Sequence, residues 1–384
     1  MTAPNRPIVL AAGGTGGHVF PAQSLAGALA DRGIRIALIT DRRANALDGA
    51  LATADTYRIR AGGLSGRGPV QRLVALADLG IGFLQARRIL KSIDPMAVVG
   101  FGSYASAPTM AAAVGLGCRT VIHEQNAILG RANRLFASRV TNIATAFRSV
   151  ANLRDEDRPK TVWTGNPVRP EIIGIAGEPY PAIEDNGPIN LLVFGGSLGA
   201  TVFSKVVPEA LTSLPDTVQN RLRLTQQCRA EDLDAVRKIY EDAGLQADLA
   251  PFFSDMPNKF AAAHLVICRA GASTIAELAA AGRPAILVPY PHATDDHQTR
   301  NAECLCDAGG GWMIPQEAFT ADSLAARLTT LLSNTKSLRT TALCAGQIGM
   351  RNATDNLTDL VLSAAGYSDN GDTITGTHSR EAAE

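Results

Sequence analysis

The sequence lacks an excess of charge of either sign, and it has few aromatic residues. Its 384 residues include 36 Lys and Arg against 36 Asp and Glu, so the formal net charge is +0, and aromatic residues make up 5%. A balanced charge excludes the chain-wide basic surface of many nucleic-acid-binding proteins, so we expect no nucleic-acid partner. Hydrophobic residues still make up 46%, which indicates a globular chain whose length suits two domains.

The six cysteines lack the paired spacing of a zinc site or of a disulfide framework. No Cys-x-x-Cys pair occurs, and Cys304 with Cys306 is half of a metal site without a second pair. Reduced thiols that pack as small apolar side chains are therefore the expected state.

Long apolar segments are also missing. The apolar run near the start is too short for the core of a signal peptide, and it passes directly into glycines. No charge occurs between Asp94 and Arg119, but glycine and proline interrupt this stretch. It therefore predicts a strand, a loop and a helix rather than a membrane span.

The sequence does contain a regular alternation of short apolar runs and helical patterns. This alternation predicts an α/β fold with doubly wound parallel sheets. The expected strands are Ile8–Ala12, Ile34–Thr40, Ala97–Gly100, Thr120–His123, Asn190–Phe194, Leu265–Cys268 and Ala285–Pro289. The expected helices include Pro21–Asp31, Val202–Leu214 and Ile275–Ala281.

The two halves of the chain open alike. One reads IVLAAGGTGG and the other NLLVFGGSLGA, each a buried strand followed by a glycine turn and a helix. This repetition predicts two Rossmann-like domains that face each other across a cleft. The expected domains are residues 1–167 and 168–350, and residues 351–384 should form a helix that packs back on the first domain, then a mobile polar tail from Ser368.

The first glycine loop, Gly13–Gly17, predicts a phosphate-binding turn. Glycines let the backbone approach a ligand, and the following helix N-terminus offers free N–H groups to an anion. A tight turn with nothing bound is the alternative, although the matching loop in the second half favours a ligand. NAD is a runner-up, because Asp41 ends the second strand as in NAD enzymes, but Val19 replaces the last glycine of that fingerprint. The lysine of a Walker loop is absent.

His18 follows this loop directly, near the expected start of the helix. The positive end of a helix disfavours a second positive charge, so His18 should stay neutral and could act as a general base. A ring that only hydrogen-bonds to a neighbouring loop is the alternative.

The segment Cys268–Asn301 contains the strongest cluster of polar residues. Arg269 and the helix N-terminus after Gly271 could both face a diphosphate. Glu277 lies one turn inside that helix, where its carboxylate could accept hydrogen bonds from two ribose hydroxyls. Thr274-x-x-Glu277 also matches a capping box, in which Glu277 binds only backbone N–H groups, and spacing alone leaves both interpretations open.

Four titratable residues lie close together after the last of these strands: His292, Asp295, Asp296 and His297. Their spacing fits no common ligand motif, so we expect no metal. A solvated loop that contacts a sugar or a nucleotide is the favoured interpretation.

Several motifs together resemble the MurG family of glycosyltransferases. In chain order they are GGTGGHVFPA, FGSYAS, HEQNAILGRANR, TGNPVR, FGGSLGA and AGASTIAELAAAGRPAILVPYPHATDDHQTRNA, and the likeness extends to about residue 360. The resemblance implies a GT-B fold, with acceptor and membrane on the first domain and UDP-GlcNAc on the second. It also implies inverting transfer of N-acetylglucosamine, without metal or cofactor. The acceptor would be the C4 hydroxyl of N-acetylmuramic acid in undecaprenyl-pyrophosphoryl-MurNAc-pentapeptide (lipid I), and the product would be lipid II for peptidoglycan synthesis.

The resemblance further implies roles for single residues. His18 corresponds to the proposed base and Glu277 to the ribose-binding acid. Arg269 and the turn after it correspond to the stretch that holds the diphosphate, and Phe253 to a backbone contact with uracil. The implied substrate-binding residues are Thr15, Gly16, Gly17, Asn126, Arg169, Ser197, Phe253, Arg269, Gly271, Ala272, Ser273, Thr274, Glu277 and Gln298.

Because lipid I lies in a membrane, the resemblance implies a peripheral protein at the cytoplasmic face of the bacterial inner membrane. The segment Arg67–Lys91 mixes basic and apolar residues with one acidic residue, Asp78, and this composition suits an anionic membrane surface. A helix that buries its apolar stripe in its own domain is the alternative, and Gly80 and Gly82 weaken a long helix. Other cell-wall synthesis proteins are further candidate partners.

Other functions of the same fold stay open on the sequence alone. One is a different GT-B enzyme, such as a glycolipid glycosyltransferase or a UDP-GlcNAc 2-epimerase, although the epimerase needs carboxylates at the sugar and HEQN supplies only Glu124. Another is a non-catalytic module that binds a nucleotide sugar. Leu198 and Thr299 stand where the MurG family often has glutamine.

Overall fold

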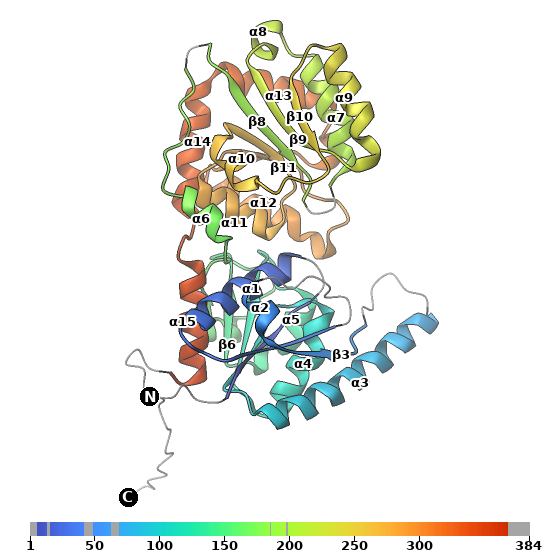
Figure 1. Ribbon diagram of the computed structural model, residues 1–384, viewed down its shortest axis with the longest axis vertical. Helices are drawn as coiled ribbons and strands as arrows, with labels where there is room; N and C mark the ends of the chain where they lie inside the picture. The colour runs from blue at the N-terminus through green and yellow to red at the C-terminus, as the bar shows by residue number, and fades with distance from the viewer. Residues whose placement is uncertain are drawn as a thin grey trace, which may run out of the picture. The chain divides into compact units, whose positions relative to one another are not determined.

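A computed structural model of the chain describes residues 6–13, 16–41, 49–62, 69–184, 186–196 and 199–367, with only the backbone at Gly16, Pro69, Val70 and Arg72. The chain divides into two compact units, shown in Figure 1. Unit 1 comprises the described residues up to Gln125, Leu129–Gly165, and those from Asn352 onward. Unit 2 comprises Asn126–Ile128 and Asn166–Arg351.

Unit 1 contains a seven-stranded sheet in the order β3-β2-β1-β4-β5-β6-β7, and every pair of neighbours is parallel. Its strands are β1 (Ile8–Ala11), β2 (Ile36–Asp41), β3 (Asp55–Ile59), β4 (Ala97–Gly100), β5 (Thr120–Glu124), β6 (Asn142–Thr145) and β7 (Thr161–Trp163). Its α-helices are α1 (Gly16–Asp31), α2 (Ala50–Thr53), α3 (Pro69–Ile93), α4 (Ser103–Gly115), α5 (Arg131–Phe136) and α15 (Ala353–Ala365).

The central strands of unit 1 are buried on both faces, which explains why their sequences are continuous apolar runs rather than alternating ones. Successive residues of a strand point to opposite faces. Ile8 and Leu10 of β1 therefore belong to a core shared with α1 and α15, whereas Val9 belongs to a second core that includes Leu90 of α3 and Met110 of α4.

Helix α15 follows unit 2 in the sequence but packs in unit 1, against α1, β4, β5 and β6. Figure 1 shows it beside α1. Leu357 and Val361 lie on its buried face. On its exposed side, Arg32, which directly follows α1, binds Asp359 at 2.6 Å and Asp355 at 3.8 Å. The polar tail expected from Ser368 lies outside the described residues.

Unit 2 contains a six-stranded parallel sheet in the order β10-β9-β8-β11-β12-β13. Its strands are β8 (Ile189–Phe194), β9 (Leu222–Gln227), β10 (Ala247–Ala250), β11 (Leu265–Cys268), β12 (Ala285–Leu287) and β13 (Gly311–Met313). Its α-helices are α6 (Pro170–Ile175), α7 (Thr201–Thr212), α8 (Asp216–Gln219), α9 (Leu233–Asp242), α10 (Met256–Ala262), α11 (Ala272–Ala281), α12 (His297–Asp307), α13 (Ala321–Ser333) and α14 (Thr335–Ile348).

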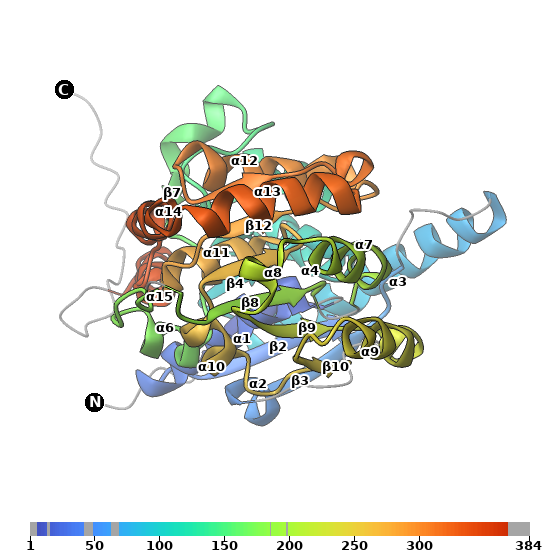
Figure 2. The ribbon, with the colours of Figure 1, turned by 90° about the horizontal axis from the view of Figure 1, so that it is seen from above.

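The main core of unit 2 lies between this sheet and the helices on one of its faces. Leu191 and Val193 of β8 pack there with Phe203 of α7, Tyr240 of α9 and Leu328 of α13. Figure 2 shows α7 and α9, which contact each other on this face. Both units are thus doubly wound parallel-sheet structures, and the predicted α/β fold class is confirmed. The strands expected from the sequence agree with the observed ones to within two residues at each end.

Two helices begin earlier than expected. Helix α1 begins at Gly16 rather than at Pro21, so His18 lies inside its first turn. Helix α11 begins at Ala272 rather than at Ile275. In both cases the first turn is made of small or weakly helical residues, and the tertiary context outweighs their low propensity. Both helices therefore present their first N–H groups closer to the strand end than the sequence pattern indicates.

Helix α3 is continuous over Pro69–Ile93 despite its two glycines. A Cβ atom on Gly82 would collide with the carbonyl oxygen of Arg60, so this glycine permits close approach of the chain after β3. The two glycines thus do not interrupt the helix, although each lowers its intrinsic propensity. None of the helices in the described ranges combines the length and apolarity that crossing a bilayer requires.

Candidate active site

The glycine loop of unit 1 joins β1 to α1 in a crowded turn. A Cβ atom on Gly13 would lie 2.7 Å from Cβ of Ala105 and 3.1 Å from Oγ1 of Thr40, so only glycine fits there. Gly17 is exposed, and no atom lies within 4 Å of its would-be Cβ. Gly16 is the first residue of α1. Thr15 lies outside the described residues.

His18, in the first turn of α1, is half-buried and held through one ring nitrogen. Its Nδ1 lies 2.8 Å from the carbonyl oxygen of Phe101 and 3.0 Å from Oε1 of Gln125. A carbonyl oxygen can only accept a hydrogen bond, so Nδ1 must carry the proton. In the neutral ring Nε2 then has the lone pair, which is the form a general base needs.

In unit 2, the sequence predicts a diphosphate-binding turn between β11 and α11. Gly271 is the N-cap of α11, and no side chain caps the helix there. The N–H groups at the first turn, which begins with Ala272, Ser273 and Thr274, therefore have no side-chain cap to satisfy them. Oγ of Ser273 is buried, and no group in the described parts of the chain bonds to it. Ser197, expected to contribute from the second glycine loop, lies outside the described residues.

Glu277 does not cap α11. Instead, Arg169 donates to both of its carboxylate oxygens, from Nε to Oε1 at 2.8 Å and from Nη2 to Oε2 at 3.1 Å. The capping-box interpretation with Thr274 is therefore wrong. Burial raises the pKa of the Glu277 carboxyl, and Arg169 opposes that rise. Each carboxylate oxygen keeps a second lone pair, so the carboxylate can still accept hydrogen bonds from hydroxyl groups.

Arg269, at the end of β11, is more strongly engaged than its expected role suggests. Its Nη1 donates to the carbonyl oxygens of Val288 and Pro289 at 3.0 and 3.1 Å, and Nη2 donates to Oε1 of Gln316 at 2.6 Å. Of its five N–H donors, this leaves Nε–H and one Nη2–H for an anion. Burial lowers the pKa of its guanidinium.

Gln298, in the first turn of α12, ties two loops together through its side-chain oxygen. Oε1 accepts from the backbone N–H of Ala270 at 3.2 Å and from that of Tyr290 at 2.9 Å. These two donors fix the orientation of the amide, so its NH2 group is the part that can donate to a ligand.

Asn126 lies in a short segment that belongs to unit 2, and a residue the sequence pattern did not single out holds it there. Asn301 of α12 is fully buried. Its Nδ2 donates to Oδ1 of Asn126 and to the carbonyl oxygen of Ala270, each at 3.1 Å, and its Oδ1 accepts from the N–H of Ala127 at 2.8 Å. Asn301 thus fixes which end of the Asn126 amide can face a ligand.

Phe253, expected to contact uracil through its backbone, is buried after β10, with Nζ of Lys259 5.3 Å from its ring centre. The neighbouring Phe252 is 70% exposed. The buried ring anchors the loop, so the backbone at this position is held in place.

Side chains of the His292–His297 cluster, for which we expect no metal, form hydrogen bonds with nearby residues of the same segment. Nδ1 of His297 lies 2.8 Å from the carbonyl oxygen of Thr294, and Thr299 donates to Asp296 at 2.7 Å. Within the described ranges, no group of three or more His, Cys, Asp or Glu residues is arranged to hold a metal ion. Burial raises the pKa of Cys306 to about 11.

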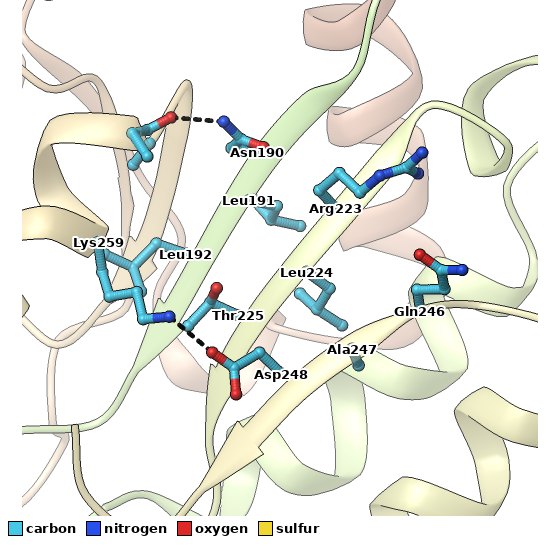
Figure 3. A pocket seen from close by; sticks show the side chains of 12 residues that line it. Asn190, Leu191, Leu192, Arg223, Leu224, Thr225, Gln246, Ala247, Asp248 and Lys259 are labelled. Carbon is cyan, nitrogen blue, oxygen red and sulfur yellow. Dashed lines mark hydrogen bonds and ion pairs between the residues drawn. The ribbon is translucent and has the colours of Figure 1, made fainter. Parts of the chain in front are cut away.

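A cavity of about 440 Å³ lies on the face formed by β8, β9 and β10 (Figure 3). Lys259 and Asp248 form an ion pair of 2.6 Å at its edge, and Nδ2 of Asn190 donates to the carbonyl oxygen of Ala262 at 2.8 Å. None of the site residues expected from the sequence lines this cavity. The cavity therefore does not belong to the candidate site.

Family models match both units. The model of the glycosyltransferase family 28 N-terminal domain matches residues 8–145, and that of the family 28 C-terminal domain matches residues 190–357. Together these matches cover most of the chain.

Two curated relatives carry the name UDP-N-acetylglucosamine--N-acetylmuramyl-(pentapeptide) pyrophosphoryl-undecaprenol N-acetylglucosamine transferase. The protein from Paramagnetospirillum magneticum is 54% identical over 92% of this chain and 96% of its own length. The protein from Rhodospirillum centenum is 52% identical over 94% of this chain and 95% of its own.

Solved structures agree with these matches. The crystal structure of Acinetobacter baumannii MurG is 31% identical, has a TM-score of 0.75, and covers 93% of this chain and 99% of that one. A UDP-GlcNAc 2-epimerase from Neisseria meningitidis has a TM-score of 0.61 at 12% identity over 93% of this chain and all of that one, which shows the shared fold alone. The predicted GT-B fold is confirmed, and the chain belongs to the MurG family within glycosyltransferase family 28.

Proposed function

We propose that the protein transfers N-acetylglucosamine from UDP-GlcNAc to the C4 hydroxyl of N-acetylmuramic acid in lipid I, with inversion at the anomeric carbon, to give lipid II. The observation that carries this proposal is the similarity over nearly the full length to transferases with this named activity, at 54% and 52% identity. A likeness over one unit alone would support only nucleotide-sugar binding.

Unit 2 supplies groups suited to the donor. The uncapped first turn of α11 and the remaining N–H groups of Arg269 favour a diphosphate, and the buried hydroxyl of Ser273 is an additional donor. As the glycosidic bond to UDP breaks, negative charge grows on the diphosphate, and fixed donors of this kind stabilise it. Glu277, oriented by Arg169, suits the ribose hydroxyls.

Unit 1 supplies the base. His18 presents Nε2 with its lone pair, because Nδ1 donates to Phe101. In the proposed step the C4 hydroxyl loses its proton to Nε2 while its oxygen bonds to the anomeric carbon. The bond from that carbon to UDP breaks, and its electron pair leaves with the diphosphate.

The test is release of UDP from UDP-GlcNAc with and without a short-chain lipid I analogue, with mass spectrometry of the product. Acceptor-dependent release and a product heavier by one N-acetylhexosamine support the transferase. Release without acceptor and formation of N-acetylmannosamine would indicate an epimerase. Tight binding of UDP-GlcNAc without release would indicate a binding module or another acceptor.

The role of His18 has its own test. His18→Ala should lower kcat by about 10²- to 10⁴-fold, the usual contribution of a general base, while the affinity for UDP stays unchanged. Near-normal turnover in this variant would remove His18 from the base role.

Peripheral docking on an anionic membrane is part of the proposal, and helix α3 is the candidate surface. Five of its large apolar side chains are exposed, while Leu90 on another side of the helix is buried in unit 1: Leu73 by 68%, Val74 by 56%, Leu76 by 53%, Ile81 by 40% and Leu84 by 64%. The helical period places Arg88 and Lys91, both exposed, on the same side as Leu84. Arg67 lies outside the described residues, as does the side chain of Arg72.

An apolar face bordered by basic side chains suits an anionic membrane at its cytoplasmic face. Reversal of Arg87, Arg88 and Lys91 to Glu should reduce sedimentation with anionic vesicles. The matched control reverses Lys336, Arg339 and Arg351 of unit 2, which changes the net charge equally and should leave sedimentation unchanged. Equal sedimentation of both variants and the unmodified protein would contradict docking through α3.

A further inference from the structure

A chain of hydrogen bonds in unit 1 connects the backbone carbonyl of Gly165 through His123 and Gln125 to His18, the proposed base. We call this chain the relay. Nε2 of His123 lies 3.2 Å from the carbonyl oxygen of Gly165. Nε2 of Gln125 lies 3.0 Å from Nδ1 of His123, and Oε1 of Gln125 lies 3.0 Å from Nδ1 of His18. His123 and Gln125 are both buried, at 0% and 2% exposure.

The carbonyl oxygen of Gly165 determines which nitrogen atoms along this chain carry protons. Because the Gly165 carbonyl can only accept, Nε2 of His123 carries the proton and Nδ1 has the lone pair. That lone pair accepts from the amide NH2 of Gln125, which also donates to the carbonyl oxygen of His123 at 3.0 Å. The amide oxygen is thereby turned toward His18, and it accepts from Nδ1–H there.

This order of donors and acceptors requires that the His123 ring is neutral. Burial, together with the proximity of His18, lowers the pKa of His123 to about 4, although the hydrogen bond to Gly165 opposes this shift. At neutral pH the imidazole therefore keeps one proton, and Gln125 keeps one orientation.

The described elements next to this end of α1 carry few other ionisable groups. Glu124 is buried beside the relay, with its carboxylate held by the N–H of Gly130 and by Asn133, each at 2.8 Å. Asp359 and Asp355 of α15 bind Arg32 at the other end of the helix. The remaining titratable groups on β2 and on α5 are Asp41, Arg131 and Arg134.

We propose that His123 and Gln125 are positioning residues that hold His18 in the Nδ1-protonated tautomer, with Nε2 ready to take the acceptor's proton. This inference rests on the proposed base role of His18. When Nε2 takes the proton, the ring becomes an imidazolium whose Nδ1–H still donates to Gln125 and Phe101. The two oxygens stabilise the positive charge that forms, as hydrogen bonds to a charged group do.

Two substitutions of Gln125 test the relay. Gln125→Met keeps nearly the same side-chain length but removes the hydrogen bonds to His18 and His123, and it should lower kcat about 10-fold or more, with unchanged affinity for UDP. Gln125→Glu keeps an acceptor for His18 and adds a negative charge. Because an adjacent carboxylate favours the imidazolium, the acid limb of the pH profile of kcat should move up by about one pH unit. Gln219→Met, which removes a surface-helix amide of unit 2, is the matched control and should leave kcat unchanged.

A double variant distinguishes positioning of His18 from a merely structural role of Gln125. If Gln125 acts only through His18, Gln125→Met should cause no further loss of the residual rate in the His18→Ala background. A loss as large as in the native background, or an unmoved acid limb in Gln125→Glu, would overturn the proposal.

The unmodified protein gives a test that needs no variant to fold. The ¹⁵N NMR spectrum of its histidine rings should show that the neutral form of His18 carries its proton at Nδ1 and not at Nε2. The opposite tautomer would overturn the relay. Near-normal turnover in His18→Ala would instead refute the base role and with it the relay's part in the reaction, so the two failures are distinguishable.

Discussion

Replacement of Arg169 by Met leaves the carboxylate of Glu277 buried without its cationic partner. Breaking a fully buried pair costs about 3–5 kcal/mol, because an uncompensated charge remains in a poorly solvated site. The Glu277 side chain is 12% exposed and that of Arg169 is 35% exposed. Because solvent screens part of this interaction, we expect unit 2 to lose about 2–3 kcal/mol at pH 8.

The loss should depend on pH. Burial already raises the pKa of Glu277, and Arg169 opposes it, so the substitution raises this pKa further. A carboxyl whose folded pKa lies above its unfolded value favours the protonated folded state. The destabilisation should therefore be smallest below about pH 4.3, the pKa of an unfolded glutamate, and should grow as the pH rises through the raised pKa.

Urea denaturation can report on unit 2 alone. The chain has two tryptophans, Trp163 on β7 of unit 1 and Trp312 on β13 of unit 2. In a Trp163→Phe background the fluorescence of Trp312, which packs against the core of unit 2, follows only that unit. The matched control adds Glu277→Gln to Arg169→Met, which removes the buried charge and should recover most of the loss. Equal losses at pH 5 and pH 8, or no recovery in the double variant, would refute this reasoning.

Three further outcomes are expected. Gly13→Ala should destabilise unit 1 by about 1–3 kcal/mol through overpacking against Ala105, whereas Gly17→Ala, with open space at its Cβ, should be neutral or stabilising by up to about 1 kcal/mol; thermal unfolding compares them. Asn301→Ala should cost about 2–3 kcal/mol by leaving buried polar groups without partners, and calorimetry should show weaker UDP-GlcNAc binding. Acidification from pH 6.5 to 4 should destabilise unit 1 by up to about 3 kcal/mol, because the unfolded state binds a proton at His123 over this range while the folded state, in which the pKa of His123 is about 4, largely does not. His123→Gln should flatten that part of the stability curve.

Seven strands of the two sheets could be predicted from the sequence because they are buried on both faces and therefore appear as largely apolar runs. Strands such as β3 and β7 are partly exposed and lack this pattern. Helix starts were harder, since Gly16 and Gly17 have poor helix propensity and yet form the first turn of α1. The need for glycine at position 82 cannot be recognised from the local sequence either, because it comes from the nearby Arg60 backbone rather than from α3 itself.

Local spacing could not decide between the two interpretations of Glu277. The capping box looked plausible because its residues lie three apart, while the true partner, Arg169, is 108 positions away in the chain. Asn301 was missed for a similar reason: its partners lie on a segment 174 and 175 positions away. Periodicity and spacing carry information about neighbours in sequence, but not about side chains brought together by the fold.

The HEQN stretch is a second case in which the sequence does not identify the partners of a residue. Its residues pointed to Asn126 through a family resemblance, whereas the positions of His123 and Gln125 gain meaning only from the carbonyl of Gly165 and the ring of His18. A signal did exist, because His123, Glu124 and Gln125 are consecutive polar residues directly after the apolar pair Val121 and Ile122. Their partners could not be named without the structure.

The return of α15 to unit 1 constrains how the protein is made. During synthesis every residue of unit 2 leaves the ribosome before α15 does, so unit 2 can complete its core while the sheet of unit 1 still lacks the helix that carries Leu357 and Val361. Until then one face of that sheet keeps apolar surface exposed around Leu25 and Leu29 of α1. The nascent chain is therefore most prone to aggregate just before its last helix emerges, and premature termination near residue 350 yields a product that chaperones and proteases should recognise.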